Sequence, residues 1–155
     1  MHLYLVQHGK ATPKEQDPER PLTPEGRAEA KKMARFLRPL KPNVDCLWHS
    51  GKLRARQTAK VLADALAGDA DPAAREGLAP NDNVALLRDE MAVATDDTMI
   101  VGHMPFVSRL ATLLLTGYES PPAVTFANAA VVCLQRTADG RWQVEWIVTP
   151  KLICE

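Results

Sequence analysis

The chain alternates between short apolar runs and longer helix-like runs, and this order constrains its fold more than any other feature. The apolar run Leu3–Gln7 favours a strand buried on both faces, and Val44–Trp48 and Thr98–Val101 favour two further strands. Helical spacing or strong helix propensity follows each of them, over residues 24–37, 53–67, 83–92 and 105–116. Strands and helices in this order predict a parallel sheet with helices on both of its faces.

Helix boundaries follow from residue chemistry. Thr23 and Pro24 are of the types preferred at a helix N-cap and at the first helical position, and Pro39 stops that helix. Ser50 suits the N-cap of the next helix, and Gly68 suits its C-terminal stop. Three polar, Pro- or Gly-containing stretches are predicted loops, at residues 8–22, 68–82 and 118–128.

The C-terminal part of the chain is typical of a β-hairpin. Ala130–Arg136 and Arg141–Val148 favour strands and flank the turn Ala138-Asp139-Gly140. We therefore predict an α/β fold, a three-layer sandwich whose mostly parallel sheet is flanked by helices and ends in a C-terminal β-hairpin. At 155 residues, without a linker-like segment, the chain is expected to form one domain over residues 1–155.

Composition narrows the class of protein. No apolar run approaches the roughly 18 residues that span a bilayer, so no membrane partner is expected. The three cysteines form no CxxC pair and residues 1–7 do not resemble a signal peptide, which predicts a cytoplasmic protein with reduced thiols. Zero net charge and few aromatic residues disfavour a nucleic-acid binder. Residues 1–60 nevertheless hold 13 Lys and Arg against 6 Asp and Glu, which favours an anionic ligand near them.

Polar pairs follow the three predicted strands, namely His8-Gly9, His49-Ser50 and Gly102-His103. Ligands of such sheets bind beyond the carboxyl ends of the strands, so these pairs are expected to meet at one edge. A histidine at a strand exit can be held by backbone contacts with one ring nitrogen free to attack. Gly9 would let backbone N–H groups approach an anion, Arg54 would offer a planar fork, and His103 would donate a hydrogen bond. Taken singly, each also fits a simpler role as a turn, a solvated arginine or a buried histidine.

Together these segments resemble the histidine phosphatase superfamily, the phosphoglycerate-mutase-like fold, and within it the SixA-type phosphohistidine phosphatases. The resemblance covers essentially the whole chain and rests on segments in family order and spacing: His8-Gly9, Arg20-Pro21-Leu22-Thr23-Pro24-Glu25-Gly26, Ser50 with Arg54-Ala55-Arg56-Gln57-Thr58-Ala59, and Gly102-His103-Met104-Pro105.

The resemblance implies a two-step displacement. His8 would take the phosphoryl group, and water would later hydrolyse phospho-His8. Arg54, His103 and the residue at position 7 would bind the equatorial oxygens, where charge lies in the transition state. Further phosphate contacts are expected from Gly9, Arg20 and Ser50. No metal or other cofactor is expected, because protein cations supply the positive charge.

Position 7 departs from the family pattern, which has arginine before the His-Gly pair where this chain has Gln7. Glutamine can donate a hydrogen bond, but it carries no charge and cannot grip two oxygens in a fork. Three cations lie close enough in sequence to replace the missing one, namely Lys10, Lys14 and Arg20. Arg20 is favoured because it belongs to one of the segments that carry the resemblance.

A general acid is also lacking. Glu76 and Asp82 occupy the stretch where larger relatives carry a glutamate, but neither lies in a recognisable motif. SixA-type members lack an obvious acid as well. This suits a phosphohistidine substrate, whose P–N bond is labile once the imidazole is protonated.

Three functions remain open from the sequence. The preferred one is a metal-independent phosphatase for protein phosphohistidine, with a histidine-phosphotransfer domain as a candidate partner. The second is a phosphatase for small phosphate esters. The third is a binding module that recognises phosphorylated partners without turnover, which Gln7 favours. Retention of His8, Arg54 and His103 together argues for an enzyme.

Overall fold

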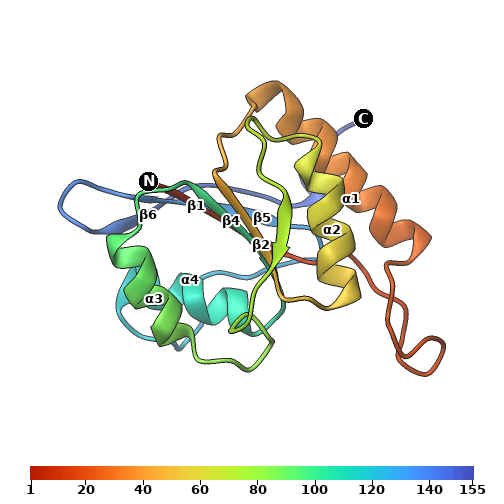
Figure 1. Ribbon diagram of the computed structural model, residues 1–155, viewed down its shortest axis with the longest axis horizontal. Helices are drawn as coiled ribbons and strands as arrows, with labels where there is room; N and C mark the ends of the chain where they lie inside the picture. The colour runs from red at the N-terminus through yellow and green to blue at the C-terminus, as the bar shows by residue number, and fades with distance from the viewer.

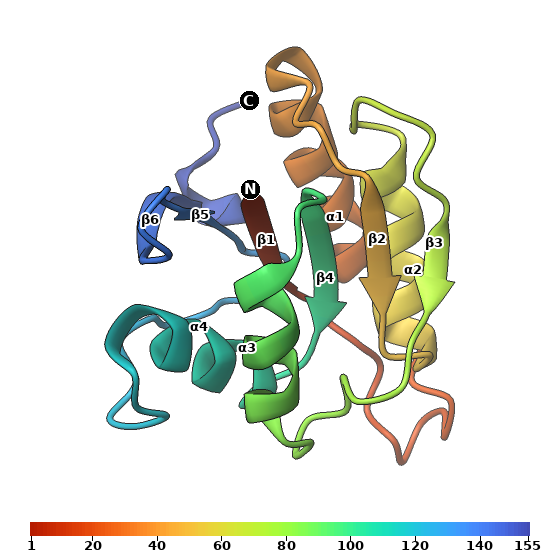
Figure 2. The ribbon, with the colours of Figure 1, turned by 60° about the vertical axis from the view of Figure 1, so that its left-hand side comes forward.

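The computed structural model describes residues 1–155 and arranges them as one six-stranded sheet between two pairs of helices (Figures 1 and 2). The strands are β1 (His2–Gln7), β2 (Cys46–His49), β3 (Pro72–Ala74), β4 (Thr98–Gly102), β5 (Val131–Arg136) and β6 (Trp142–Val148). The helices are α1 (Pro24–Leu37), α2 (Leu53–Ala63), α3 (Val84–Val93) and α4 (Phe106–Thr116), with short 3₁₀ turns η1 (Arg38–Leu40) and η2 (Pro150–Leu152). None of the helices is both long and apolar enough to cross a bilayer.

The sheet has the strand order β3-β2-β4-β1-β5-β6. The first four strands in this order are parallel, whereas β5 runs antiparallel to β1 and β6 antiparallel to β5. The predicted three-layer α/β fold with its C-terminal hairpin is therefore confirmed. Because β1, β2 and β4 are parallel neighbours, the residues that follow them emerge at the same edge of the sheet.

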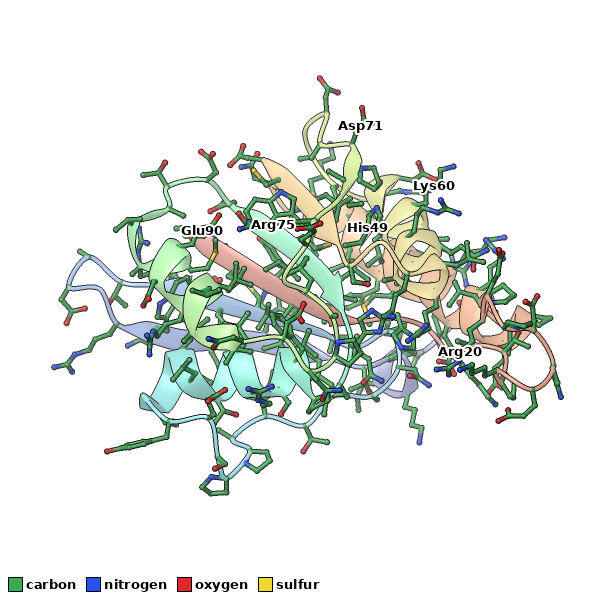
Figure 3. The ribbon with its side chains drawn as sticks, turned by 60° about the horizontal axis from the view of Figure 1, so that its bottom comes forward. Arg20, His49, Lys60, Asp71, Arg75 and Glu90 are labelled. Atoms are coloured by element: carbon green, nitrogen blue, oxygen red, sulfur yellow. The ribbon has the colours of Figure 1, made fainter.

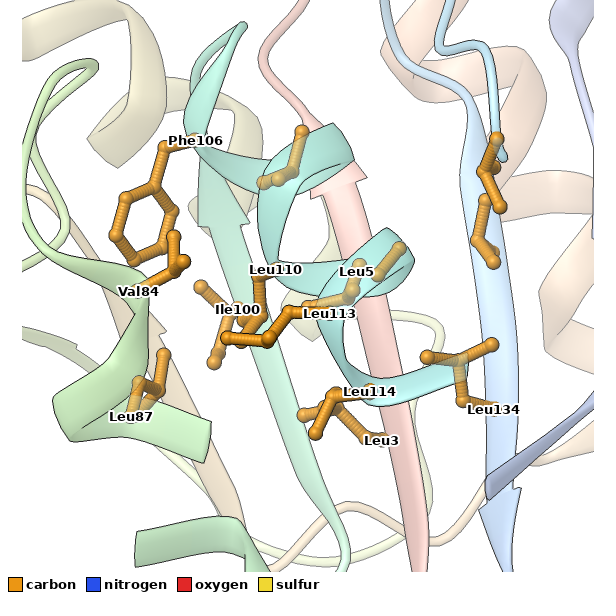
Figure 4. Close-up of a cluster of buried hydrophobic side chains, with 14 of the residues drawn as sticks. Leu3, Leu5, Val84, Leu87, Ile100, Phe106, Leu110, Leu113, Leu114 and Leu134 are labelled. Carbon is orange, nitrogen blue, oxygen red and sulfur yellow. The ribbon is translucent and has the colours of Figure 1, made fainter. Parts of the chain in front are cut away.

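Strand β1 is buried on both faces because its side chains alternate between two cores. Leu3 and Leu5 belong to the core under α3 and α4, whereas Tyr4 and Val6 belong to the core under α1 and α2. Figure 4 shows the first of these cores, where Leu110 and other apolar side chains of α4 meet the strands. Burying one leucine of this kind contributes about 1.5–3 kcal/mol, so the paired cores fix β1 and the loop that leaves it.

Helix α1 begins and ends as the sequence predicts. Pro24 is its first residue, and the Thr23 hydroxyl accepts a hydrogen bond from the Gly26 N–H at 2.9 Å. The α-helix ends at Leu37, and Pro39 lies in the 3₁₀ turn that follows. The cap matters for the site because it fixes where the preceding loop joins the helix.

The segment after α2 departs from the prediction. Helix α2 ends at Ala63 rather than at residue 67, because the next residues bond back to the chain before β2. The Ala67 N–H donates to the Pro42 carbonyl, and the Val44 N–H donates to the Ala67 carbonyl. Strand β3 lies in a predicted loop, and its Pro-Ala-Ala sequence carries little strand propensity. Pairing with β2 decides its conformation.

Candidate active site

The residues after β1, β2 and β4 meet at one edge of the sheet, as the sequence predicts. The rings of His8 and His103 lie with their centroids 5.0 Å apart. Ser50 Oγ lies 2.6 Å from His103 Nε2. From α2, Arg54 Nε donates to His8 Nε2 at 3.3 Å. Four groups from three separate stretches of the chain therefore surround one position.

His8 is oriented so that one ring nitrogen carries the proton and the other is unprotonated. Its Nδ1 lies 2.6 Å from the Gly9 carbonyl, which can only accept, so Nδ1 donates and Nε2 keeps its lone pair. Burial, with a smaller contribution from the nearby Arg54 and Arg20 charges, lowers the pKa of His8 to about 4. At neutral pH His8 is thus an uncharged imidazole, the form that can attack an electrophile.

His103 is also held neutral. It is 2% exposed, and burial lowers its pKa to about 3, with His8 and Arg54 contributing. Its Nε2 meets Ser50, whereas its buried Nδ1 has no hydrogen-bond partner. A hydroxyl can accept from or donate to the ring, so the Ser50 contact orients His103 and is compatible with either of its neutral tautomers.

Ser50 does not have the capping role predicted for it. The N-cap of α2 is Lys52, whose side chain makes no capping hydrogen bond. The Ser50 hydroxyl lies too far before the helix to accept from its first turn and instead contacts His103 and the Lys52 N–H. Tertiary contact with β4 thus outweighs local capping at this residue.

Helix α2 holds the loop that carries His8. The Thr58 hydroxyl accepts from the Gly9 N–H at 3.0 Å and donates to the Arg54 carbonyl at 2.8 Å. Gln57 Oε1 accepts from the Leu22 N–H at 2.8 Å, at the other end of the loop. The sequence offered a signal for Thr58, since it lies one helical turn after Arg54, but only the fold shows that it faces Gly9.

The loop after His8 packs backbone to backbone on the first turn of α1. A Cβ on Gly26 would lie 2.1 Å from the Lys10 carbonyl oxygen, and one on Gly9 would lie 2.9 Å from the Gly26 carbonyl oxygen. Both positions therefore require glycine. The Gly9 N–H expected to face an anion is donated to Thr58 in this structure, so Gly9 acts here by allowing close approach.

Among the cations proposed to replace the family arginine, Arg20 is the one whose charge reaches the site. It lowers the pKa of His8, of Arg54 and of His103. Its Nε donates to the Thr12 carbonyl at 3.2 Å, and Figure 3 shows it on the long loop beside α2. Lys10 is instead paired with Glu25 at 2.6 Å, and Lys14 is exposed.

Neither carboxylate considered as a general acid reaches the histidines. Asp82 accepts a hydrogen bond from the Ala79 N–H at 2.8 Å. With Glu76 it borders a hollow beside α3, near the Arg75 and Glu90 pair labelled in Figure 3. No carboxylate forms a hydrogen bond or ion pair with the residues at the centre of the site, His8, Arg54 and His103. Positive charge is therefore left without a counter-ion, which suits an anionic ligand.

Gln7 turns toward the loop before β5. Its Nε2 donates to Asn128 Oδ1 at 3.0 Å, and its buried Oε1 has no partner. Sequence reasoning did not find Asn128, which lies in a predicted loop 121 residues away in the chain. Nothing in the local pattern marks it.

Comparison with known proteins places the chain in a family. Residues 3–80 match the model of the histidine phosphatase superfamily (branch 1), and the chain belongs to that superfamily. It is 29% identical to phosphohistidine phosphatase SixA of Escherichia coli strain K12, over 93% of each protein. It is 34% identical to an uncharacterised protein of Picosynechococcus sp., over 76% of this chain and 74% of that one.

Solved structures agree on the fold. The structure of the protein histidine phosphatase SixA complexed with tungstate matches 98% of this chain and 99% of its own with a TM-score of 0.85, at 24% identity. A mycobacterial glucosyl-3-phosphoglycerate phosphatase bound to VO3 matches 94% of this chain and 97% of its own with a TM-score of 0.72, at 17% identity. The same fold thus serves phosphatases with different substrates, and the substrate has to be argued from the site.

Proposed function

We propose that this chain is a phosphatase that forms a phosphohistidine on His8 and acts on phosphohistidine of a phosphorylated protein. The observation that carries the proposal is a neutral His8 whose Nε2 lone pair faces Arg54 and lies beside His103. In the first step Nε2 attacks phosphorus while the bond to the leaving group breaks. In the second step water attacks phosphorus, the P–N bond to His8 breaks, and inorganic phosphate leaves.

The charges around His8 support phosphoryl transfer. Arg54 and Arg20 both act on His8 electrostatically, and no carboxylate contacts it. Such cations stabilise the negative charge that gathers on the equatorial oxygens. Arg54, His103 and Gln7 are the proposed oxygen ligands, with Ser50 orienting His103 and Arg20 supplying part of the charge that Gln7 lacks. This scheme uses no metal or other cofactor.

The lack of a carboxylic acid near His8 favours a phosphoramidate substrate. An alkoxide leaving group needs a proton from a general acid, whereas an imidazole that is already protonated leaves unaided. The similarity to SixA points in the same direction. We therefore place protein phosphohistidine before small phosphate esters as the substrate class.

The test is a rapid-quench assay with a ³²P-labelled histidine-phosphotransfer protein and, separately, with p-nitrophenyl phosphate. Wild type should become labelled and release phosphate, and His8→Ala should do neither. His2→Gln is the matched control, because His2 begins β1, the strand that His8 follows, and pairs with Glu145 and Asp97 at the end far from the site. Faster turnover of p-nitrophenyl phosphate than of the phosphoprotein would favour small phosphate esters as the substrate class. Vanadate binding without a labelled intermediate from either donor would identify a binding module instead.

A second prediction concerns the charge at position 7. Gln7→Arg should raise kcat for p-nitrophenyl phosphate by up to about 10-fold, because a charge-assisted hydrogen bond is roughly twice as strong as a neutral one. Unchanged or lower activity would show that Arg20 already fills this role. Measuring Gln7→Arg in an Arg20→Ala background separates the two cations.

A further inference from the structure

Two buried side-chain polar atoms in the structure have no hydrogen-bond partner, and both belong to the proposed site. They are Gln7 Oε1 and His103 Nδ1. Their residues are close in the fold, since Gln7 pairs with Gly102 across β1 and β4 and His103 follows directly. Buried polar groups are nearly always paired, so an unpaired one needs an explanation. A ligand that completes their hydrogen bonding is one such explanation.

The orientation of the Gln7 carboxamide decides what position 7 can offer. With Nε2 donating to Asn128, the carbonyl oxygen is the group left over. An oxygen in that place accepts hydrogen bonds only, and it repels the oxygens of a phosphoryl group. An amide nitrogen in the same place has N–H groups to donate.

Rotating the side-chain amides of Gln7 and Asn128 by a half-turn keeps a hydrogen bond between them and exchanges the positions of oxygen and nitrogen in each amide. Asn128 Nδ2 then donates to Gln7 Oε1, and Gln7 Nε2 moves to the place that Oε1 now occupies. Oxygen and nitrogen have nearly the same size, so the exchange requires no change in packing. An arginine at position 7 has no such choice, because every polar atom of its guanidinium is a donor.

The backbone around Asn128 is fixed to the end of β1, so its side chain is held within reach of Gln7. The Ala129 N–H donates to the Gln7 carbonyl at 3.0 Å and to the His8 carbonyl at 3.3 Å. The Gln7 N–H donates to the Ala130 carbonyl at 3.4 Å. Ala129 has φ of 60°, a left-handed conformation that a residue with a Cβ seldom adopts. Such strain is found where the surrounding structure enforces a functional geometry.

The geometry points to Asn128 as a positioning residue that, by reversing with Gln7, turns the Gln7 amide into a donor for a phosphoryl oxygen. This inference rests on the proposed function and adds to it a mechanism by which an uncharged residue serves where the family has arginine. Asn128 acts through Gln7 and does not itself touch the substrate.

A double-mutant cycle on full-length protein tests this role. Asn128→Ala should lower kcat for p-nitrophenyl phosphate and vanadate affinity by about 10-fold, less than the loss of a whole transition-state donor. In a Gln7→Met background, which retains shape but has no amide, Asn128→Ala should have no further effect. Thr125→Ala, at an exposed position in the same loop, is the matched control and should change neither quantity.

Asn128→Asp fixes the amide in the wrong orientation. A carboxylate can only accept, so Gln7 Nε2 must keep facing position 128. In otherwise wild-type protein, Asn128→Asp should therefore lower kcat and vanadate affinity more than Asn128→Ala does. Asn128→Asp in the Gln7→Met background measures the effect of the added charge alone. That effect is subtracted from the loss that Asn128→Asp causes in otherwise wild-type protein.

A spectroscopic measurement distinguishes positioning from a merely structural role. The side-chain ¹⁵N–¹H signals of Gln7, assigned by their absence in Gln7→Met, should shift on adding vanadate to wild type and stay unchanged in Asn128→Asp. Equal losses from Asn128→Ala in both backgrounds, or no loss in wild type, would overturn the inference. A wild-type protein that neither binds vanadate nor forms phospho-His8 would instead overturn the proposed function.

Discussion

Helices α2 and α3 are of similar length and lie on opposite faces of the sheet, yet they serve different purposes. Helix α2 buries mainly small side chains, Ala55, Thr58 and Ala59, and contacts β2, β3 and β4 directly. Helix α3 buries Val84, Leu87 and Met91 and packs chiefly on α4. Figure 2 shows the two helices on either side of the strands.

The difference in side-chain size has a functional consequence. Small residues let α2 approach the sheet closely enough for Arg54 to reach His8 and for Thr58 to reach Gly9. Large residues on α3 fill a core but bring no polar group of α3 to the histidines. One face of the sheet therefore positions the chemistry, while α3 on the other face supplies stability.

Among substitutions in the two helices, Arg54→Ala should have the largest effect on activity. Removal of a charged transition-state donor is expected to lower kcat by about 10²–10³-fold, with little change in the free energy of unfolding. Steady-state kinetics and urea denaturation measure the two quantities. Arg56→Ala, two residues along the same helix and exposed, is the control and should retain activity. Equal losses from the two variants would mean that α2 contributes general positive charge and no specific contact.

Met91→Ala should show the opposite pattern. Met91 is fully buried, and truncating such a side chain costs about 2–5 kcal/mol of stability. Activity per folded molecule should stay unchanged at low temperature, because α3 holds no group near His8. The urea midpoint and the kcat of the folded fraction test this. A fall in kcat as large as that caused by Arg54→Ala would contradict the assignment of α3 to stability and α2 to the active site.

Ala59→Leu tests whether close packing of α2 is what positions the site. Ala59 is fully buried, so added methyl groups should cost about 1–3 kcal/mol and push α2 from the sheet. Turnover should fall together with stability, since Arg54 would move away from His8. Ala92→Leu, at an exposed position of α3, is the control and should change neither turnover nor stability. Loss of stability with full kcat would show that Arg54 tolerates displacement of its helix.

The pKa values of the two histidines predict an acid-sensitive fold. Unfolded histidine titrates near pH 6.5, whereas the pKa of His8 is lowered to about 4 and that of His103 to about 3. Below pH 6.5 the unfolded chain binds more protons than the folded one, so stability is complete above that pH and declines as pH falls toward 4. We expect a loss of roughly 4 kcal/mol between pH 7 and pH 5, about half of it from each histidine.

Urea unfolding at pH 7 and pH 5 measures this dependence. His103→Gln should flatten it by about half, because one of the two buried imidazoles is gone. The same pKa values predict that kcat/KM shows no inflection near pH 6.5, since His8 is neutral on both sides of it. An inflection there would mean that His8 titrates as an ordinary exposed histidine.

Much of the fold was predictable because it depends on local and periodic signals. The alternation of apolar and helix-like runs predicted the parallel sheet, and Thr23-Pro24 predicted the first residue of α1 correctly. The end of α2, strand β3 and the helix-capping role of Ser50 were predicted wrongly for a common reason. Each is decided by a partner distant in sequence, respectively the chain before β2, strand β2 itself and His103.

The sequence by itself determined which residues are candidates for the proposed chemistry and that parallel strands bring them to one edge, because residue type and strand direction are encoded locally. Only the tertiary structure decided how they are held. It showed that Thr58 anchors Gly9, that Gly26 admits the loop, and that Gln7 faces Asn128 across 121 residues of chain. Those contacts depend on ångström-scale distances between segments that have no common local pattern, and only packing of the whole chain sets such distances.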